Sequence, residues 1–593
     1  MAAPQPLLSD NAMRVLKARY LRRDAERRII ETPGELFERV ARGVAHAELL
    51  LGNARQAAHW QARFQELLAT LDFLPNSPTL MNAGTPMGQL SACFVLPVED
   101  SIEGIFDALK QMALVQRTGG GTGFSFSRLR PRGASVGGGA GQTPGPVSCF
   151  RVFDAATEHI KLGGRRRGAN MAVLRVDHPD VREFIAAKLD GSLPNFNISV
   201  GVTDAFMRAA AEDQPFDLLD PRTGRRVDRT AARALFTEII EAAWQTGDPG
   251  LLFLDAVNRT HPLRHRGEIE GTNPCGEVPL LPHESCNLGS INLAHMIREQ
   301  RGRVEVDWDK LQATTFAAVR LLDDVVEVNR YPSPEIDEGS RGSRKIGVGV
   351  MGFAELLVRL GIPYDSDAAV RAADELMRKI AEAAREASRE LAAERGVYPF
   401  WQGSRHDQEG LRVRNATVTA IAPTGTISII AGTSAGIEPL FALAYRRTHV
   451  LGGETLMEVN PLLRNELERR RIDPREVIEA VKRTGRLQEA EAPAELRRLF
   501  VTAHEVPPER HLEIQAAFQR HVDNSVSKTV NLPESITPEE IGQIYRRAWE
   551  LGLKGVTVYR YHSKPAQVLE LGVGEESYHF EHAARCDPSE CRV

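Results

Sequence analysis

The stretch QLSACFVLPVEDSIEGIFDALKQMALVQ, residues 89–116, joins a short apolar run to an amphipathic segment. Short apolar runs favour buried strands. In the second part, apolar side chains recur at helical spacing, namely Ile102, Ile105, Phe106, Leu109 and Met112. Because strand–helix alternation of this kind continues along the chain, we predict an α/β architecture.

The chain before this stretch is predicted to be helical. Thr32 is expected to cap a helix that has Pro33 at its first position, with Glu35 completing a capping box. Residues 1–85 are therefore expected to form a helical layer over a larger domain.

The chain after it divides into three predicted parts. A catalytic α/β domain is expected over residues 86–565, and within it a long helix from about 368 to Arg395. Residues from about 451 to 530 are more polar and helical, as in an insertion. Residues 566–593 have no periodicity and are predicted to form a flexible tail.

Composition excludes several classes of protein. The 593 residues are 42% hydrophobic and 26% charged, as in a globular protein. A net charge of −5 gives no reason to expect a nucleic-acid partner. We find no run of about 18 apolar residues and no signal peptide, so we expect no membrane and a cytoplasmic location. In the cytosol, the six cysteines are expected to be structural, metal-binding or catalytic rather than a disulfide framework.

The segment NPCGEVPL, residues 273–280, places Cys275 between an amide and a carboxylate. Asn273, Cys275 and Glu277 alternate, so in extended backbone their side chains would leave the same face. A hydrogen-bond donor, a thiol and a base in one pocket suit radical chemistry at a sugar carbon. Alternatively, Cys275 is a small buried residue in a Pro–Gly turn. A zinc site that uses His283 and Cys286 is disfavoured by the ten-residue gap between the cysteines.

The remaining cysteines fall into two kinds. Cys93 and Cys286 are far apart in sequence, as two thiols on separate strands of one cavity could be, although each could equally be buried and inert. Cys586 and Cys591 form a C-x₄-C pair in the predicted tail, where they could close a disulfide or exchange with another one. Cys149 is interpreted as structural.

One segment is a candidate phosphate site. In APTGTISIIAG, residues 422–432, the backbone N–H groups of small and hydroxyl residues could hold phosphate, although a plain strand-entry turn is the alternative. The glycine-rich residues 119–146 lack the G-K-[ST] ending of a P-loop. GVGVMG, residues 347–352, lacks the second strand of a dinucleotide site.

Taken together, these stretches resemble the large catalytic chain of ribonucleotide reductases. The resemblance covers residues from about 30 to 565, and its motifs arrive in family order: LPNSPTLMNAGT, LSACFVLPVEDS, RRGANMAVLRVDHPD, NPCGEVPL, SCNLGSINLA, APTGTISIIAG and DNSVSKTVNLP. It implies a ten-stranded α/β barrel made of two five-stranded parallel halves, with a finger loop inside that carries the key cysteine.

The resemblance also implies roles for the cysteines. Cys275 falls on the cysteine that becomes a thiyl radical, and Asn273 and Glu277 fall on its polar partners. Cys93 and Cys286 fall on the pair that supplies two electrons and becomes a disulfide. Cys586 and Cys591 are then the tail pair that reduces it.

Further residues fall on binding positions of the family. The implied substrate contacts are Ser77, Thr79, Ser91, Ala92, Pro423, Thr424, Gly425, Thr426, Ile427 and Ser428. The implied contacts with an allosteric effector, a deoxynucleotide or ATP, are Asp100, Ile102, Arg130, Arg166, Gly168 and Ala169.

The source of the radical distinguishes three subfamilies. The oxygen-dependent one relays the radical through adjacent tyrosines, but no two of the nine tyrosines here are adjacent, and the expected place has Arg560 between Tyr559 and Tyr561. The glycyl-radical subfamily has a C-terminal glycine motif that this chain lacks. The resemblance therefore favours the adenosylcobalamin-dependent subfamily, in which cobalamin carries the cobalt and the chain binds no other metal.

The resemblance implies the partners as well. We expect ribonucleoside diphosphates as substrates, thioredoxin or glutaredoxin as reductant, and a homodimer with effector sites where the chains meet. The small N-terminal ATP-sensing region of many relatives is not seen, so we expect effectors to regulate only the choice of substrate.

One alternative is the large subunit of the oxygen-dependent subfamily, which needs a dimetal partner. A regulatory protein that binds zinc and nucleotide without catalysis is another.

Overall fold

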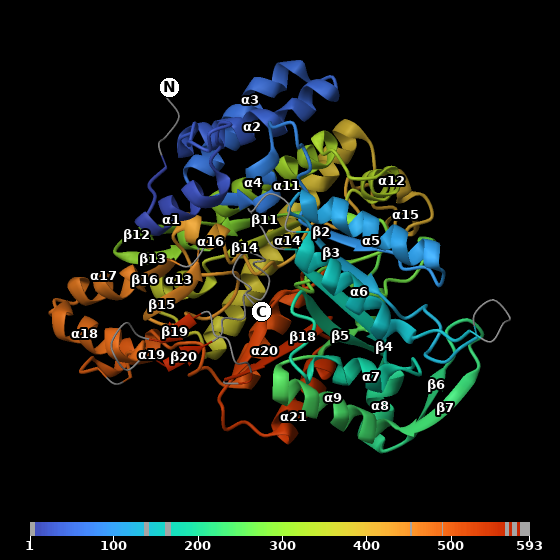
Figure 1. Cartoon of the computed structure of the whole chain (residues 1–593). Helices are drawn as coiled ribbons and strands as arrows, with labels where there is room; N and C mark the ends of the chain where they lie inside the picture. The colour runs from blue at the N-terminus through green and yellow to red at the C-terminus, as the bar shows by residue number, and fades with distance from the viewer. Residues whose placement is uncertain are drawn as a thin grey trace.

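A ten-stranded mixed sheet flanked by helices organises the chain (Figure 1). The structure is a computed structural model that describes residues 6–135, 141–160, 168–450, 454–488, 490–561, 563, 569–571 and 578–580. Neighbouring strands follow the order β1 (Phe73–Pro75), β11 (Ser285–Asn292), β2 (Cys93–Leu96), β3 (Gly121–Ser125), β4 (Asn170–Arg175), β5 (Phe196–Val202), β8 (Gly250–Phe253), β18 (Gly555–Arg560) and β17 (Thr529–Leu532), and β14 (Ile346–Met351) pairs with β11. The predicted α/β class is confirmed.

Five consecutive strands of this sheet, from β2 to β8, run parallel. At one end β11 joins β2 antiparallel, and at the other β18 joins β8 antiparallel. Beyond these joins, β14 is parallel to β11, and β17 is parallel to β18. The run of five matches one predicted parallel half, whereas the regular ladders of the described residues leave the sheet open.

Two hydrophobic cores cover the sheet. In the first, α2 (Pro33–Leu50) and α3 (Ala54–Ala69), at the top of Figure 1, pack with α11 (Trp308–Val328) and α14 (Asp367–Arg395). In the second, the parallel strands pack with α5 (Ile102–Arg117), α6 (Gly145–His159), α9 (Ala232–Thr246) and α21 (Pro538–Glu550). These two cores cover different strands of the sheet. On the opposite face of β11, Cys286 and Leu288 pack with Val278 and Leu280 in a smaller cluster, so β11 is buried along its whole length.

The predicted capping box at Thr32 and the predicted end of the long helix at Arg395 are confirmed. Thr32 accepts a hydrogen bond from the backbone of Glu35, whose side chain reaches back in a capping box. The long helix α14 ends at Arg395, with Gly396 as its C-cap. On α5, however, Ile102 and Phe106 are 69% and 57% exposed, so no described residue covers that apolar face.

A two-stranded hairpin, β9 (Gly271–Thr272) and β10 (Pro279–Leu280), carries the segment around Cys275. It passes so close to β3 that a Cβ on Gly123 would lie 1.8 Å from the carbonyl oxygen of Thr272, so only glycine fits there. The tip is a turn in which Gly276 N–H donates to the Asn273 carbonyl at 3.0 Å, with Gly276 at φ 78°. The expectation of extended backbone at residues 273–277 is therefore wrong.

Peripheral elements surround the sheet. A hairpin of β6 (Pro215–Leu219) and β7 (Arg226–Ala231) extends from the parallel half. A separate four-stranded sheet orders β16 (Glu454–Val459), β15 (Ala444–Val450), β19 (Leu569–Leu571) and β20 (Tyr578–Phe580). Its last two strands lie within the predicted tail, whereas Cys586 and Cys591 lie outside the described residues.

The predicted polar insertion contains helices, as expected. These are α17 (Pro461–Arg469), α18 (Pro474–Thr484), α19 (Ala494–Leu499) and α20 (Pro508–Gln519), and α20 packs against α14. Within the described part of the chain, no helix combines the length and apolar composition needed to span a bilayer.

Candidate active site

The turn at the tip of the β9–β10 hairpin brings three predicted side chains together. Asn273 Nδ2 donates to Glu277 Oε2 at 2.8 Å, and the Cys275 thiol is also hydrogen-bonded to the Glu277 carboxyl group. Asn273 and Glu277 are buried, whereas Cys275 is half-buried. The amide, thiol and carboxyl group thus meet as predicted, although through a turn rather than through strand alternation.

The environment of Glu277 changes its acidity. Burial raises the pKa of Glu277 to about 7, and hydrogen bonds from Asn273, Cys93 and Cys275 only partly oppose this shift. A carboxyl group with a pKa near neutrality can both accept and return a proton, as a general base must do within a catalytic cycle.

The thiols of Cys93 and Cys286 come from adjacent antiparallel strands. These residues are direct partners between β2 and β11. Directly opposite residues of an antiparallel pair have Cα atoms about 4.5–5.5 Å apart, which lies within the range that a disulfide spans. Cys93 Sγ also accepts from Asn273 Nδ2 at 3.2 Å and lies 3.8 Å from Glu277 Oε1. The pair therefore adjoins the hairpin tip.

A narrow cavity of about 90 Å³ opens at the hairpin tip. Cys93, Asn273, Cys275 and Glu277 line one side. Of the predicted substrate contacts, Ser77, Ala92, Pro423, Thr424, Gly425, Thr426 and Ile427 line the cavity. Thr79, Ser91 and Ser428 are not among the lining residues.

The structure gives two of those three residues other partners. Thr79 Oγ1 donates to the Leu90 carbonyl, and Ser91 Oγ donates to Asn287 Oδ1, in both cases inside the protein. Both hydroxyl groups thus form hydrogen bonds within the protein rather than lining the cavity.

The segment 422–427 has features of an anion site. Thr424 has φ 58°, a left-handed conformation that is costly for a β-branched residue. Its Oγ1 accepts from Gly436 N at 2.7 Å, which helps to hold this conformation. No acceptor within the described residues takes the backbone N–H groups of Thr424, Gly425 or Thr426. These donors are available to a ligand in the cavity.

The cavity also contains residues that the sequence did not single out. Asn76 caps the short helix α4 (Ser77–Asn82) through Oδ1, while its buried Nδ2 has no hydrogen-bond partner in the described structure. Gly121 and Ser290 line the cavity as well. Asn76 and Ser290 lie within motifs that carry the family resemblance, which is the signal that could have identified them.

A second cavity also borders Cys275. Its polar lining comprises Asn197, Ser199, Asp248, Thr272, Ser527, Lys528, Thr529 and Thr557. Apolar walls are provided by Met171, Leu251, Val526 and Val556. Cys275 and its neighbour Pro274 thus line both cavities.

The predicted effector residues lie apart from these cavities, with one exception. Arg130 Nε binds Asp100 Oδ2 at 2.8 Å, and Ile102 begins the neighbouring helix α5. Ala169, just before β4, lines the first cavity. Arg166 lies outside the described residues, and Gly168 packs against Gln116.

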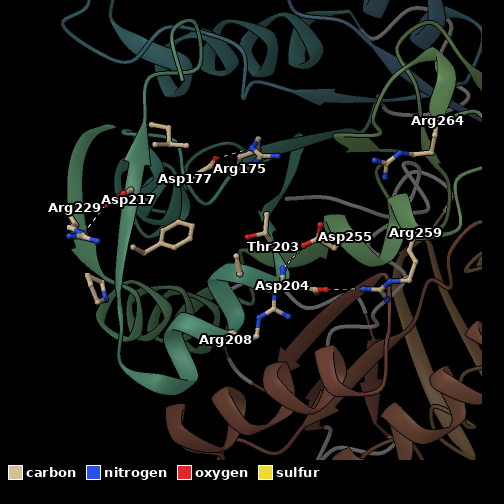
Figure 2. Close-up of a pocket in the computed structure, with 14 residues that line it drawn as sticks. Arg175, Asp177, Thr203, Asp204, Arg208, Asp217, Arg229, Asp255, Arg259 and Arg264 are labelled. Carbon is tan, nitrogen blue, oxygen red and sulfur yellow. Dashed lines mark hydrogen bonds and ion pairs between the residues drawn. The ribbon is translucent and has the colours of Figure 1, made fainter. Parts of the chain in front are cut away.

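A larger cavity, about 880 Å³, contains none of the cysteines. It lies beyond the carboxyl ends of β4 and β5, beside the β6–β7 hairpin, and Figure 2 shows its arginines and aspartates. Most of these charges pair internally, as in Arg175–Asp177, Arg259–Asp204 and Arg229–Asp217. Choosing the candidate site by cavity volume would therefore give a site without cysteines.

The zinc alternative gains no support. Among the described residues, no three His, Cys, Asp or Glu side chains gather as metal ligands. Cys275 bonds to Glu277, and Cys286 faces Cys93.

Two protein-family models match this chain. The all-alpha domain of ribonucleotide reductase matches residues 6–88, and the barrel domain matches residues 91–413 and 408–559. A vitamin B12-dependent ribonucleoside-diphosphate reductase of Mycobacterium tuberculosis is 54% identical over 95% of this chain and 80% of its own length. A Thermoplasma acidophilum protein of the same description is 47% identical over 96% of this chain and 81% of its own.

A solved structure shares the fold. The class Id ribonucleotide reductase alpha subunit of Actinobacillus ureae superposes with a TM-score of 0.74, covering 94% of this chain and 97% of that one. Its sequence identity is 23%, so this likeness concerns the fold alone.

Proposed function

This chain belongs to the ribonucleotide reductase family, and we propose that it reduces ribonucleoside diphosphates to deoxyribonucleotides with adenosylcobalamin as radical source. The observation that carries the proposal is the meeting of Cys275, Glu277 and Asn273 beside the facing thiols of Cys93 and Cys286. The M. tuberculosis and T. acidophilum relatives, both described as vitamin B12-dependent, support the same cofactor.

We further propose that the sheet closes into the ten-stranded barrel implied by the resemblance. Single parallel bridges, Val348–Thr419 and Ile421–Val526, support this closure because they lead from β14 towards β17. Residues 415–422 would then supply the missing strand of the second half. The proposed domain boundaries are residues 1–85 for the helical region, 86–565 for the catalytic domain and 566–593 for the redox tail.

The residues of the hairpin tip suggest how reduction proceeds. A thiyl radical on Cys275 takes the 3′-hydrogen atom of the ribose, and Glu277 accepts the proton of the 3′-hydroxyl group. The 2′-hydroxyl group then leaves as water, protonated by one thiol of the facing pair. Cys93 and Cys286 supply two electrons and become a disulfide, and the hydrogen of the second thiol reaches C2′. Glu277 then returns its proton to the 3′-oxygen, and Cys275 returns its hydrogen atom to C3′.

The first cavity suits a nucleotide substrate. The free N–H groups of Thr424, Gly425 and Thr426 can bind the diphosphate. Asn76 Nδ2, which lacks a partner within the described residues, can donate to the sugar or its phosphates. Asn273 holds Glu277 in place through its amide.

The second cavity fits the adenosyl part of the cofactor. Its hydroxyl, amide and carboxylate groups suit the hydroxyl groups and ring nitrogens of a nucleoside, and its apolar walls suit the base. When bound, adenosylcobalamin supplies an organic radical through homolysis of its cobalt–carbon bond. Ser199, Asp248 and Thr529 would hold that nucleoside beside Cys275, on the side away from the substrate.

The region where a radical relay would enter supports this choice. Arg560 stands between Tyr559 and Tyr561, and its guanidinium lies 4.2 Å from the ring centre of Trp244 on α9. A relay needs closely spaced redox-active side chains, which arginine does not supply. The alternative remains the large subunit of the oxygen-dependent subfamily.

We propose that the chain works as a homodimer in the cytoplasm. The exposed Ile102 and Phe106 of α5 provide an apolar face for a second copy. The nearby Asp100 and Arg130 would bind the ribose or base and the phosphates of a deoxynucleotide or ATP effector, with Ile102, Arg166, Gly168 and Ala169. Cys586 and Cys591 would pass electrons from thioredoxin or glutaredoxin to the active site.

The test is an anaerobic assay of the purified chain with CDP, dithiothreitol and adenosylcobalamin. Formation of dCDP that depends on adenosylcobalamin and needs no second protein is expected. A chain that stays inactive with adenosylcobalamin but works with a dimetal subunit would transfer the assignment to the oxygen-dependent subfamily.

A further inference from the structure

A buried lysine lies beside Cys286. Lys345 immediately precedes Ile346, which is the register partner of Asn287 between β14 and β11. Lys345 therefore lies alongside Cys286, the residue before Asn287. It is only 2% exposed. Because burying an ammonium group is costly, the buried Lys345 side chain requires a partner of opposite charge.

The partner of Lys345 is Glu284. Lys345 Nζ lies 2.6 Å from Glu284 Oε2, and both side chains are buried. The same oxygen accepts from the backbone N–H of Leu281 at 2.7 Å, so the carboxylate is fixed by the main chain. Glu284 takes one N–H of the ammonium group, which leaves the others for a further negative charge.

Two other basic residues in this region, Lys554 and His261, do not supply a positive charge to Cys286 in place of Lys345. Lys554 donates to the carbonyl groups of Asp523 and Asn524 at 2.6 and 2.5 Å. His261 is buried and neutral, since burial and then the charge of Lys345 lower the pKa of His261 to about 2.

The acidity of Cys286 reflects these surroundings. Burial raises the pKa of Cys286, and Glu277 and Glu284 raise it further. The charge of Lys345 lowers it and is the largest of the charge effects. Lys345 is thus the cation that partly offsets the effects of burial and of the two carboxyl groups, which disfavour a Cys286 thiolate.

We propose that Lys345, held by Glu284, stabilises Cys286 as a thiolate when the Cys93–Cys286 disulfide is reduced. The inference rests on the proposed function, in which this pair is oxidised in each cycle. It makes Lys345 a positioning residue and assigns different roles to the two sulfur atoms: Cys93 is attacked and Cys286 leaves.

The geometry around Cys93 supports this direction. Among the described residues, Cys93 lines the cavity at the hairpin tip, whereas Cys286 is not part of its lining and is only 1% exposed. A reductant in the cavity therefore meets Cys93 first. In thiol–disulfide exchange the sulfur with the more stable thiolate leaves faster.

The exchange then takes two steps. A thiolate of a dithiol bonds to Cys93 Sγ, and the Cys93–Cys286 bond breaks, leaving the electron pair on Cys286. The second thiolate of the dithiol attacks its own partner sulfur and releases Cys93. The dithiol is oxidised to a disulfide, and the two protons that it gave up convert both cysteines to thiols.

The experiment separates oxidation from re-reduction. All chains carry Cys586→Ser and Cys591→Ser, so that the tail cannot exchange with the Cys93–Cys286 pair. In this background, wild type at position 345, Lys345→Met and Lys345→Arg are fully reduced, freed of reductant and allowed one turnover with CDP and adenosylcobalamin. Mass spectrometry then measures the Cys93–Cys286 disulfide, and timed alkylation follows its reduction by dithiothreitol. Arg39→Met is the matched control, because Arg39 forms an equally buried 2.6 Å pair with Glu31 in the N-terminal helices.

Lys345→Met is expected to form the disulfide in normal yield but to be reduced at least about tenfold more slowly. Lys345→Arg should restore most of the rate, and Arg39→Met should behave as wild type. Re-reduction of Lys345→Met at the wild-type rate, loss of its first turnover, or an equal slowing in Arg39→Met would overturn the inference. If wild type forms no Cys93–Cys286 disulfide, the redox pair itself is wrong, and the role of Lys345 fails with it.

Discussion

Cys93 and Cys286 are direct partners across the antiparallel join between β2 and β11. This join is where the run of five parallel strands meets β11 and β14, so the two thiols mark a boundary within the sheet. Residues paired in this way have Cα atoms within the range that a disulfide spans. The hairpin tip with Cys275 and Glu277 adjoins the same place, because Asn273 bonds to both Cys93 and Glu277.

Cys275→Ser is predicted to abolish turnover while CDP still binds, because the hydroxyl group cannot form the radical that removes the 3′-hydrogen. Calorimetric titration with CDP and an assay for dCDP measure the two properties separately. Cys149→Ser is the control, since burial raises the pKa of Cys149 to about 12 and keeps this thiol unreactive. Normal dCDP formation by Cys275→Ser would remove the assignment.

The pH dependence of catalysis should follow Glu277. Its pKa is raised to about 7, chiefly by burial, so the carboxylate form needed as a base is lost as the pH falls below 7. We expect kcat/KM of the wild type to decline on the acid side of this value. Glu277→Gln should lose about 10²–10⁴-fold in activity, together with this acid limb. A wild-type profile that is flat through pH 7 would contradict the role of Glu277.

The tail cysteines should be needed for repeated turnover only. With Cys586→Ser and Cys591→Ser combined, we expect a normal first turnover and then arrest when thioredoxin is the reductant. A small dithiol that diffuses into the cavity should partly rescue the variant. Thioredoxin-driven rates equal to those of wild type would show that the pair has another role.

A buried charge network should contribute strongly to stability. Arg395 lies 2.6 Å from Glu48 and 2.7 Å from Asp324, and these three side chains are almost fully buried. Arg395→Met leaves both carboxyl groups without this partner, so we expect a loss of about 3–5 kcal/mol. The exposed Arg389–Glu386 pair supplies the control, because Arg389→Met should change stability by less than about 1 kcal/mol. Denaturant unfolding measures both, and equal midpoints would refute the difference.

Local signals made much of the fold predictable. The capping box of Thr32 and Glu35 and the stop at Gly396 need only neighbouring residues, and both are confirmed. The helical spacing of Ile102 and Phe106 correctly predicted α5. Their exposure could not be predicted, because periodicity identifies an apolar face but not what covers it.

The candidate site was predictable in its residues but not in its backbone. Alternation at residues 273–277 suggested a strand, whereas the left-handed Gly276 makes a turn that brings the same side chains together. The pair of Lys345 and Glu284 left no sequence signal, since 61 residues separate them and only the parallel pairing of β11 and β14 brings them near.

The central claim is that Cys275 carries the radical and that adenosylcobalamin alone generates it. Rapid-freeze electron paramagnetic resonance of the chain mixed anaerobically with adenosylcobalamin and an effector tests it most directly. Protein grown with β-deuterated cysteine should give a signal with altered hyperfine structure, and Cys275→Ser should give none. A signal that is unchanged by deuteration, or that persists in Cys275→Ser, would contradict the account.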